Sequence, residues 1–207
     1  MKLSELSEQS GVPIASIKFY RRENLLPPGR SLGATTADYD ESHVRRLKLI
    51  RAMTRFGGLS VAAVRDVLAA LEEPHSPVEV LGIVDYAIPA DLPEDAETTD
   101  GGPSWAADLI ERMGWDVSDH SPHRAALDAR MRALHRLGMD WDIEELLPYA
   151  RLAEQVAHLD AARIELPADP EILAERVVVF STLFGPVMPL LRRFAHENQA
   201  RGRIADV

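Results

Sequence analysis

Cysteine is absent from the 207 residues, and this absence excludes a disulfide framework, thiolate metal sites and a cysteine nucleophile. A signal peptide is not expected either, because residues 1–11 are polar and contain Glu5 and Glu8. No apolar run approaches the length of a membrane span. These absences predict a soluble cytoplasmic protein with no membrane partner.

Motifs of catalysis are lacking as well. The sequence contains no Gly-rich phosphate loop, no paired-carboxylate motif and no nucleophile beside a positioned base. The histidines at 120 and 123 are a candidate metal pair, but two histidines in a polar loop are more often solvated. We therefore expect no enzyme, no cofactor and no metal.

Basic residues are a minority overall but are unevenly distributed. The net charge is −10, yet residues 1–73 hold 11 Lys and Arg against 9 Asp and Glu. Residues 74–207 hold 12 basic residues against 24 acidic ones, and the stretch from Pro13 to Arg55 holds 9 basic residues against 4 acidic ones. This asymmetry predicts that the N-terminal third meets a polyanion and that the rest would be repelled by one.

Two short helices are predicted at the N-terminus. Ser4 is a suitable N-cap for a helix through Gln9, and Gly11 suits the left-handed position that ends it. Pro13 opens a second helix, which ends before Pro27. Two helices joined by a tight turn form a helix-turn-helix, whose second helix enters the major groove of DNA.

The second helix has an apolar side and a basic side. Its polar side chains supply hydrogen-bond donors and positive charge; they are Ser16, Lys18, Tyr20, Arg21 and Arg22. Taken alone, this stretch fits a solvated face beside a small core as well as it fits a helix lying on a polyanion. The segments that follow favour the second interpretation.

A winged domain is completed by those segments. Residues 29–40 are small and polar, which predicts a hairpin or loop that is a candidate wing. Asp40 is a suitable N-cap for a helix over 41–56 with a basic outer surface, and Ser60 is one for a fourth helix ending near Pro74. The predicted fold of this third of the chain is a winged helix-turn-helix.

The remaining chain is predicted to be helical on either side of an acidic linker. Residues 89–103 contain five acids and three prolines and no base, whereas helical patterns cover 77–88, 105–113, 122–137, 142–164 and 169–203. The run from Val177 to Phe184 favours a fully buried helix over a strand. The fold class is therefore mainly α: a winged helix-turn-helix domain at 1–73, a connecting helix and acidic linker at 74–103, and an all-helical effector-binding or dimerisation domain at 104–207.

Several motifs in the first 73 residues occur in a specific order and spacing. They are Leu3-Ser4-Glu5-Leu6, Ile17-Lys18-Phe19-Tyr20-Arg21-Arg22, Val44-Arg45-Arg46-Leu47 and Gly57-Gly58-Leu59-Ser60. In them the chain resembles the DNA-binding domain of MerR-family transcription regulators. Where that family has Arg-Tyr-Tyr-Glu, this chain has Lys18-Phe19-Tyr20-Arg21, and the family's Tyr-Arg pair in the wing is replaced by Thr36 and Ala37.

Contacts with DNA are assigned from these positions. Ser16 and Lys18 are expected at base edges or adjacent phosphates, and the phosphate anchors are Tyr20, Arg21 and Arg22. The resemblance adds backbone contacts from Tyr39, His43 and Arg46, with Arg30 as the nearest substitute in the wing. A core position for Tyr20 and a solvated surface position for His43 remain open alternatives.

Partners are implied by the same resemblance. It implies a homodimer on a palindromic promoter operator, which is bent and untwisted so that RNA polymerase engages both promoter elements. The pairing helix is either 142–164 or one of the C-terminal helices. An apolar small-molecule effector would contact the aromatic residues of the C-terminal part, although such residues more often form a core: Trp105, Trp115, Trp141, Phe180 and Phe184.

Two other functions fit parts of the sequence. A winged helix also serves DNA architectural or recombination accessory proteins, for which the long C-terminal region is a poor match. Alternatively, the acidic half binds a basic partner protein and the chain has no specific affinity for DNA. Salt-dependent DNA retention by residues 1–75 would separate this alternative from regulation.

Overall fold

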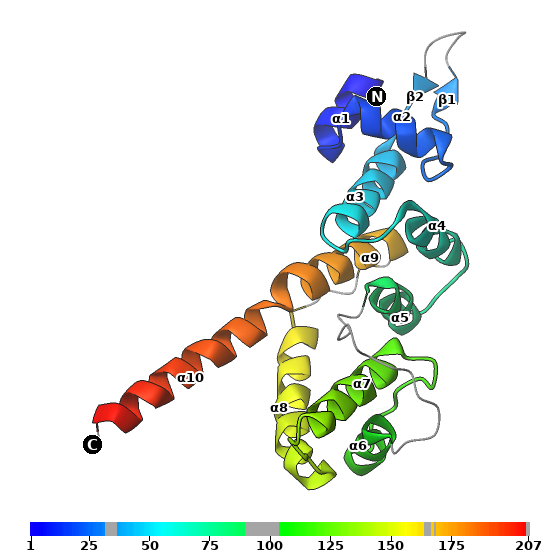
Figure 1. Ribbon diagram of the computed structural model, residues 1–207. Helices are drawn as coiled ribbons and strands as arrows, with labels where there is room; N and C mark the ends of the chain where they lie inside the picture. The colour runs from blue at the N-terminus through cyan, green and yellow to red at the C-terminus, as the bar shows by residue number, and fades with distance from the viewer. Residues whose placement is uncertain (32–36, 90–103, 164–166, 168, 206–207) are drawn as a thin grey trace. The chain divides into compact units, whose positions relative to one another are not determined.

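Figure 1 shows the computed structural model, which describes residues 1–31, 37–89, 104–163, 167 and 169–205, with side chains as far as Arg201. The described residues are mainly α-helical and include one two-stranded sheet, which confirms the predicted fold class. The chain divides into two compact units. Unit 1 comprises Met1–Ile88 and Leu166–Val207, and unit 2 comprises Pro89–Glu165.

The helix-turn-helix consists of α1 (Leu3–Ser10) and α2 (Ile14–Arg22). The N-cap of α1 is Lys2 and not Ser4, because Glu5 lies in the first turn and accepts a 2.8 Å hydrogen bond from the Lys2 backbone N–H. Gly11 ends α1 in the left-handed region at φ 64°, as predicted. Pro13 precedes α2, where its missing N–H costs nothing.

The wing hairpin is formed by β1 (Arg30–Ser31) and β2 (Ala37–Asp38), which pair antiparallel with Arg30 opposite Asp38. This confirms the predicted hairpin. Thr36, one of the two positions where the family pattern is lost, lies outside the described residues, as does the acidic segment 90–103.

Three further helices complete the N-terminal part of unit 1: α3 (Glu41–Arg55), α4 (Val61–Ala70) and α5 (Pro77–Ala87). Asp40 accepts hydrogen bonds from the backbone N–H groups of Ser42 and His43, and Ser60 accepts one from Ala63. Both predicted N-caps are confirmed. Each is worth about 1 kcal/mol to its helix.

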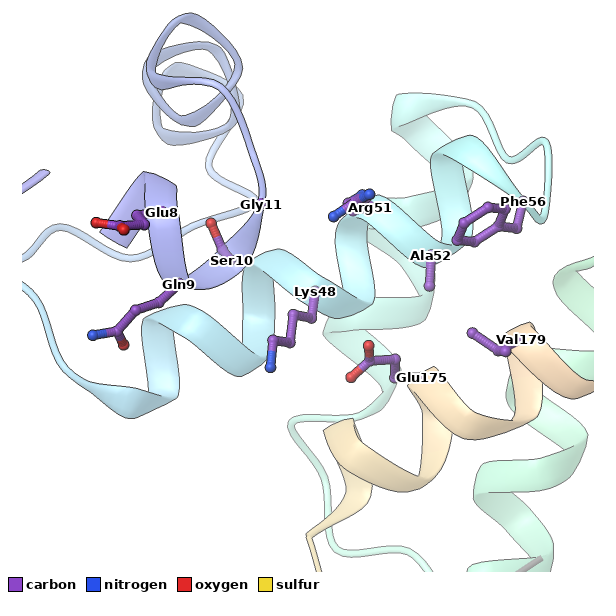
Figure 2. A pocket seen from close by; sticks show the side chains of 10 residues that line it. All are labelled: Glu8, Gln9, Ser10, Gly11, Lys48, Arg51, Ala52, Phe56, Glu175 and Val179. Atoms are coloured by element: carbon purple, nitrogen blue, oxygen red, sulfur yellow. The ribbon is translucent and has the colours of Figure 1, made fainter. Parts of the chain in front are cut away.

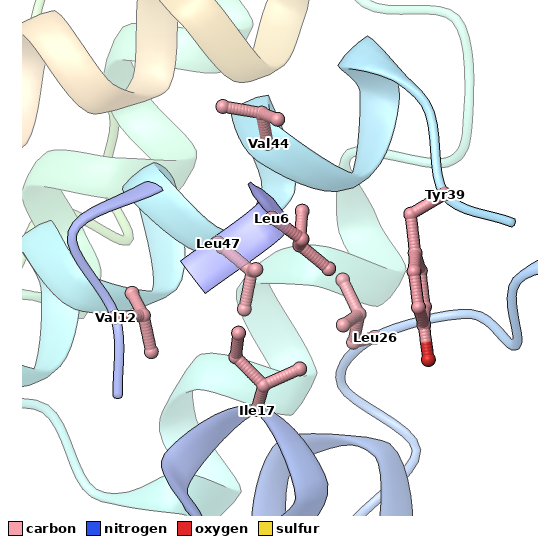
Figure 3. Packing of buried hydrophobic residues seen from close by; sticks show 7 residues of the cluster. All are labelled: Leu6, Val12, Ile17, Leu26, Tyr39, Val44 and Leu47. Atoms are coloured by element: carbon pink, nitrogen blue, oxygen red, sulfur yellow. The ribbon is translucent and has the colours of Figure 1, made fainter. Parts of the chain in front are cut away.

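A buried apolar cluster joins α1, α2, the wing and α3 (Figure 3). Its members are Leu6, Val12, Ile17, Leu26, Tyr39, Val44 and Leu47. Burying an aliphatic side chain contributes about 1.5–3 kcal/mol. The cluster therefore fixes the side of α2 that carries Ile17 inward and leaves the opposite side to solvent.

Helix α9 (Pro170–Val179) packs against α3 and α5, so the C-terminal segment belongs to the same unit as the helix-turn-helix (Figure 1). Its buried side chains are Leu173, Ala174, Val177 and Val178. This division differs from the one expected from the sequence, which separated 1–73 from 104–207. Periodicity identifies an apolar helical side but not the helices that cover it.

After α9 the chain becomes exposed. A π-helical turn, η1 (Phe180–Phe184), leads to α10 (Val187–Ala205). The expectation of a fully buried helix is correct for Val177 and Val178 but wrong for Leu183 and Phe184, which are exposed. The apolar run exceeds the apolar surface that α3 and α5 offer to it.

The segment Pro170–Arg201 is long and apolar enough to cross a membrane, by length and composition alone. This corrects the expectation that no apolar stretch approaches such a length, because the apolar residues are spread over α9, η1 and α10 with polar residues between them. In unit 1, α9 uses its apolar side to pack on α3 and α5.

Unit 2 contains α6 (Trp105–Met113), α7 (Pro122–Arg136) and α8 (Ile143–Ala161), close to the predicted ranges. Asp128 of α7 accepts hydrogen bonds from the Ser104 hydroxyl and the Ala106 N–H, at 2.8 and 2.9 Å. The Trp105 indole N–H donates to the carbonyl of Trp141. These bonds tie the start of α6 to its neighbours.

Candidate nucleic-acid interface

The exposed side of α2 carries three of the predicted contact residues, Lys18, Arg21 and Arg22. Arg21 donates a 3.0 Å hydrogen bond to the hydroxyl of Tyr39, and the Arg22 guanidinium lies 5.3 Å from the ring centroid of Phe19. Both arginines stay exposed while these contacts limit their orientations. Three cations on one exposed helix side are suited to phosphate oxygens.

Ser16 and Tyr20 lie at the border of this surface, and both are half-buried. Tyr20 packs against the buried cluster, and its ring meets Phe19 edge to face at 5.7 Å. The structure therefore gives Tyr20 a packing role, which was the open alternative. A contact from its hydroxyl to phosphate stays a prediction.

Arg30 places a further cation on the wing. Its guanidinium is exposed and lies 3.3 Å from Asp38, which also binds the N-terminal amino group of Met1 at 2.6 Å. The hydrogen bond from that amino group, helped by Arg30, lowers the pKa of Asp38. The ionised carboxylate holds the base of the wing to the start of the chain.

Tyr39 and His43 were predicted to contact the DNA backbone, but their side chains are buried, with exposures of 3% and 7%. Tyr39 fills the cluster beneath the wing, and His43 packs against its ring. His43 Nδ1 lies 2.8 Å from the Asp40 carboxylate, while Nε2 is buried without a partner. Contact from these side chains to the DNA backbone stays a prediction, and the structure gives both of them a packing role.

Asp40 organises the start of α3. Hydrogen bonds from the Ser42 hydroxyl and from His43 hold the pKa of the Asp40 carboxyl well below its usual range. The carboxylate is thus ionised at neutral pH and remains an N-cap. His43 supports this cap from inside the domain.

Arg46 is likewise engaged within the protein, with only 12% of its side chain exposed. Its guanidinium donates to the Leu25 carbonyl at 3.1 Å and to Glu171 of α9 at 2.8 Å, and it lies 3.3 Å from Glu72. A phosphate contact from Arg46 stays a prediction, and in this structure its guanidinium is already held by partners within the protein. Arg46 joins the end of the helix-turn-helix to α9.

Sequence reasoning missed the acids that hold these arginines. Arg45 pairs with Asp169 at 3.0 Å, and Arg46 pairs with Glu171. Asp169 is recognisable as an N-cap, since it accepts from the N–H groups of Glu171 and Ile172. No local signal identifies its partner on α3.

The five aromatic residues proposed for an effector pocket are divided between the two units. The three tryptophans belong to unit 2, whereas Phe180 and Phe184 lie in η1 of unit 1, with ring centroids 4.8 Å apart. A cavity of about 590 Å³ in unit 2 is lined instead by Arg112, Met113, Leu147, Arg151, Glu154 and Gln155. Trp115 reaches this cavity only indirectly, by donating its indole N–H to Glu154 at 3.0 Å.

His120 and His123 lie at the turn before α7 and at its first turn, and both are exposed. Within the described ranges, no group of three histidine, aspartate or glutamate side chains is arranged to hold a metal ion.

Comparison with known proteins follows the boundaries of the N-terminal part. Residues 1–71 match the model of the MerR HTH family of regulatory proteins. The HTH-type transcriptional regulator AdhR of Bacillus subtilis (strain 168) is 29% identical over 79 residues, which are 38% of this chain and 56% of AdhR. The match thus spans about half the length of that curated relative.

A similar solved structure extends over both units. It is a crystal structure of SCO5550 from Streptomyces coelicolor A3(2), a protein proposed to be a transcriptional regulator. The TM-score is 0.69 and the sequence identity is 34%, with 98% of this chain and 97% of that chain covered. The resemblance therefore includes the helices that follow the helix-turn-helix.

Proposed function

We propose, since the chain belongs to the MerR family of helix-turn-helix transcription regulators, that it binds a palindromic promoter operator as a homodimer. The observation that carries this proposal is the exposed row of cations on α2 beside the wing arginine, in a protein with a net charge of −10. An acidic protein approaches a polyanion only through such a local surface.

The contact set is narrower than the sequence suggested. Lys18, with Ser16 at its side, reads base edges, while phosphate is held by Arg21, Arg22 and Arg30. Tyr39, His43 and Arg46 act behind this surface. Tyr39 accepts a hydrogen bond from Arg21, and His43 and Arg46 hold the ends of the elements that present α2.

Dimerisation is assigned to α10. Its apolar side chains follow helical spacing at Val187, Leu190, Leu191 and Phe194, and Phe194 is 65% exposed. A second copy of the same stripe is its natural cover, because a two-fold interface is self-complementary. Helix α8, with Leu152 and Leu159 exposed, is the weaker candidate. It lies in unit 2, whereas α10 shares unit 1 with the DNA-binding helices and so can set half-site spacing.

Unit 2 is the proposed effector-binding part, and RNA polymerase is an indirect partner through the deformed promoter. The apolar effector expected from the sequence is less suited to the cavity in unit 2, because two arginines and a glutamate line it. A regulator of this kind acts in the cytoplasm and has no enzymatic activity of its own.

Genomic footprinting of the full chain tests the proposal. We expect protected sites with two-fold symmetry inside promoters, with half-sites about one helical turn, 34–36 Å, or a multiple of it apart. Protection without sequence preference would favour an architectural role. Absence of protection at any salt concentration would favour the acidic protein-interaction module and overturn the proposal.

A further inference from the structure

A second site lies away from the exposed side of α2. A cavity of about 410 Å³, open to solvent, is formed by α1, α3 and α9 within unit 1 (Figure 2). Helix α1 belongs to the helix-turn-helix, and α9 comes from the C-terminal segment. Any molecule in this cavity touches both.

Four charged side chains line the cavity. Lys48 and Arg51 come from α3, Glu8 from the last turns of α1, and Glu175 from α9 (Figure 2). In the part of the chain that the structure describes, none of these four side chains makes an ion pair or a side-chain hydrogen bond. Two cations and two carboxylates thus line one cavity without an ion pair among them in the described residues.

Arg51 is placed by the turn of the helix-turn-helix. Gly11 has a φ of 64°, and a Cβ at this position would collide with Nη1 of Arg51. Glycine is favoured here by the backbone conformation, and the absence of a Cβ leaves room for the guanidinium. Figure 2 shows Arg51 beside this turn, above the cavity.

Glu175, like Arg51, is half-buried. Burial raises the pKa of its carboxyl, although Lys48 and Arg176 act in the opposite direction. A carboxylate that is partly removed from water and lacks a hydrogen-bond donor gains from a donor that enters the cavity.

Part of the cavity wall is apolar. Ala52, Phe56 and Val179 form this part, and Phe56 is 38% exposed, which is high for a phenylalanine next to a core helix. Figure 2 places Phe56 and Val179 on the same side of the cavity, away from Glu8 and Gln9. An apolar substituent against this part would remove the phenylalanine ring from water.

We propose that this cavity binds a small zwitterion with an apolar substituent, of which an aliphatic or aromatic α-amino acid is the simplest example. The ammonium group donates to Glu175, and the carboxylate accepts from Arg51. A single anion or cation would be attracted by one of these two groups and repelled by the other. A zwitterion satisfies both, and its side chain covers Phe56.

Such a ligand joins α1 to α9 and is coupled to the affinity of α2 for DNA. The binding site itself goes beyond the proposed function and does not depend on it. Ligand binding is therefore measured without DNA, so that failure to find an operator leaves the result interpretable.

Isothermal titration calorimetry of the full chain with L-leucine and L-phenylalanine is the test. N-acetyl-L-leucine lacks the ammonium group, and L-leucinamide lacks the carboxylate, while both keep the side chain. We expect saturable binding of the two amino acids and affinities about tenfold or more lower for each derivative, as one charged hydrogen bond predicts. No binding of either amino acid, or equal affinity for a derivative, would overturn the proposal.

Variants locate the binding within the protein. Glu175→Gln keeps the shape of the side chain and should lower the affinity for L-leucine about tenfold. It should leave the weak binding of N-acetyl-L-leucine unchanged. Asp66→Asn, an exposed carboxyl on α4, is the matched control. Unchanged leucine affinity in Glu175→Gln, with a normal thermal unfolding curve, would show that the amino acid binds elsewhere.

Discussion

Helices α2 and α3 are both rich in basic residues, but they use them differently. The cations of α2 are exposed, whereas Arg45 and Arg46 of α3 are paired with acids of α9. Both helices carry a net positive charge that comes mainly from arginine. What distinguishes them is an acidic helix start that lies 125 residues after Arg46 in the chain. Basic residues that a sequence pattern places on one helix are therefore available to DNA only if no acidic residue from elsewhere in the chain pairs with them.

Among the variants that test this difference between α2 and α3, Arg46→Met should have the largest effect, which is a loss of stability. Removing the guanidinium leaves Glu171 unpaired and the Leu25 carbonyl without its donor, so the free energy of unfolding should fall by about 3 kcal/mol. Urea denaturation measures it. Arg22→Met on α2 is the control and should change stability by less than about 0.5 kcal/mol. Equal losses in the two variants would remove the distinction between the helices.

Phe194→Glu should have the next largest effect. A charge among the exposed apolar residues of α10 should dissociate the dimer. A monomer presents one copy of α2 instead of two, so operator affinity should fall about a hundredfold. Sedimentation and fluorescence anisotropy report the two effects. His196→Glu, on the same helix, is a control for added charge. If Phe194→Glu stays dimeric, α10 is not the pairing helix.

Lys18→Ala tests base readout by α2. It should weaken operator binding by about 2 kcal/mol and leave non-specific binding nearly unchanged. Anisotropy with an operator and with a scrambled duplex measures both. Equal losses on the two duplexes would turn Lys18 into a phosphate contact.

Arg22→Ala should have the opposite pattern and a smaller effect. Loss of one phosphate contact should weaken binding to every duplex and reduce the slope of log affinity against log salt by about one. A salt series on the same two duplexes provides the measurement. Arg136→Ala, which removes an exposed arginine of α7 in unit 2, should leave the slope of log affinity against log salt unchanged.

Glu175→Gln should have the smallest effect, a change in how stability depends on pH. Glu175 lies on α9, which packs against α3. The folded pKa of Glu175 is raised above its ordinary 4.5, so its favourable contribution is complete below the unfolded pKa. That contribution is lost as pH rises through the folded pKa. The stability of the wild type should thus decline relative to Glu175→Gln as the pH rises above 4.5. Thermal unfolding over that range measures the difference, and parallel curves would contradict it.

Local features of the fold were predictable from the sequence, because they depend on neighbouring residues. The caps at Asp40 and Ser60, the left-handed Gly11 and the hairpin all form bonds or turns within a few residues. Ser4 was wrong as an N-cap for a local reason too, since Glu5 satisfies the N–H group of Lys2.

Long-range partners were not predictable in the same way. Tyr39 and His43 are polar enough for a surface, yet the cluster around Leu6 and Ile17 buries them. Arg46 meets an acid from the far end of the chain. Periodicity indicates that a side chain has a polar or an apolar side, but the partner depends on packing between distant helices.

Unit 2 is inserted between α5 and α9, and these two helices pack against each other. The inserted segment therefore leaves and re-enters the DNA-binding unit at neighbouring helices. The entropy cost of closing such a loop rises only slowly with its length. A change in the size or sequence of the insertion is thus cheap for the unit that holds α2.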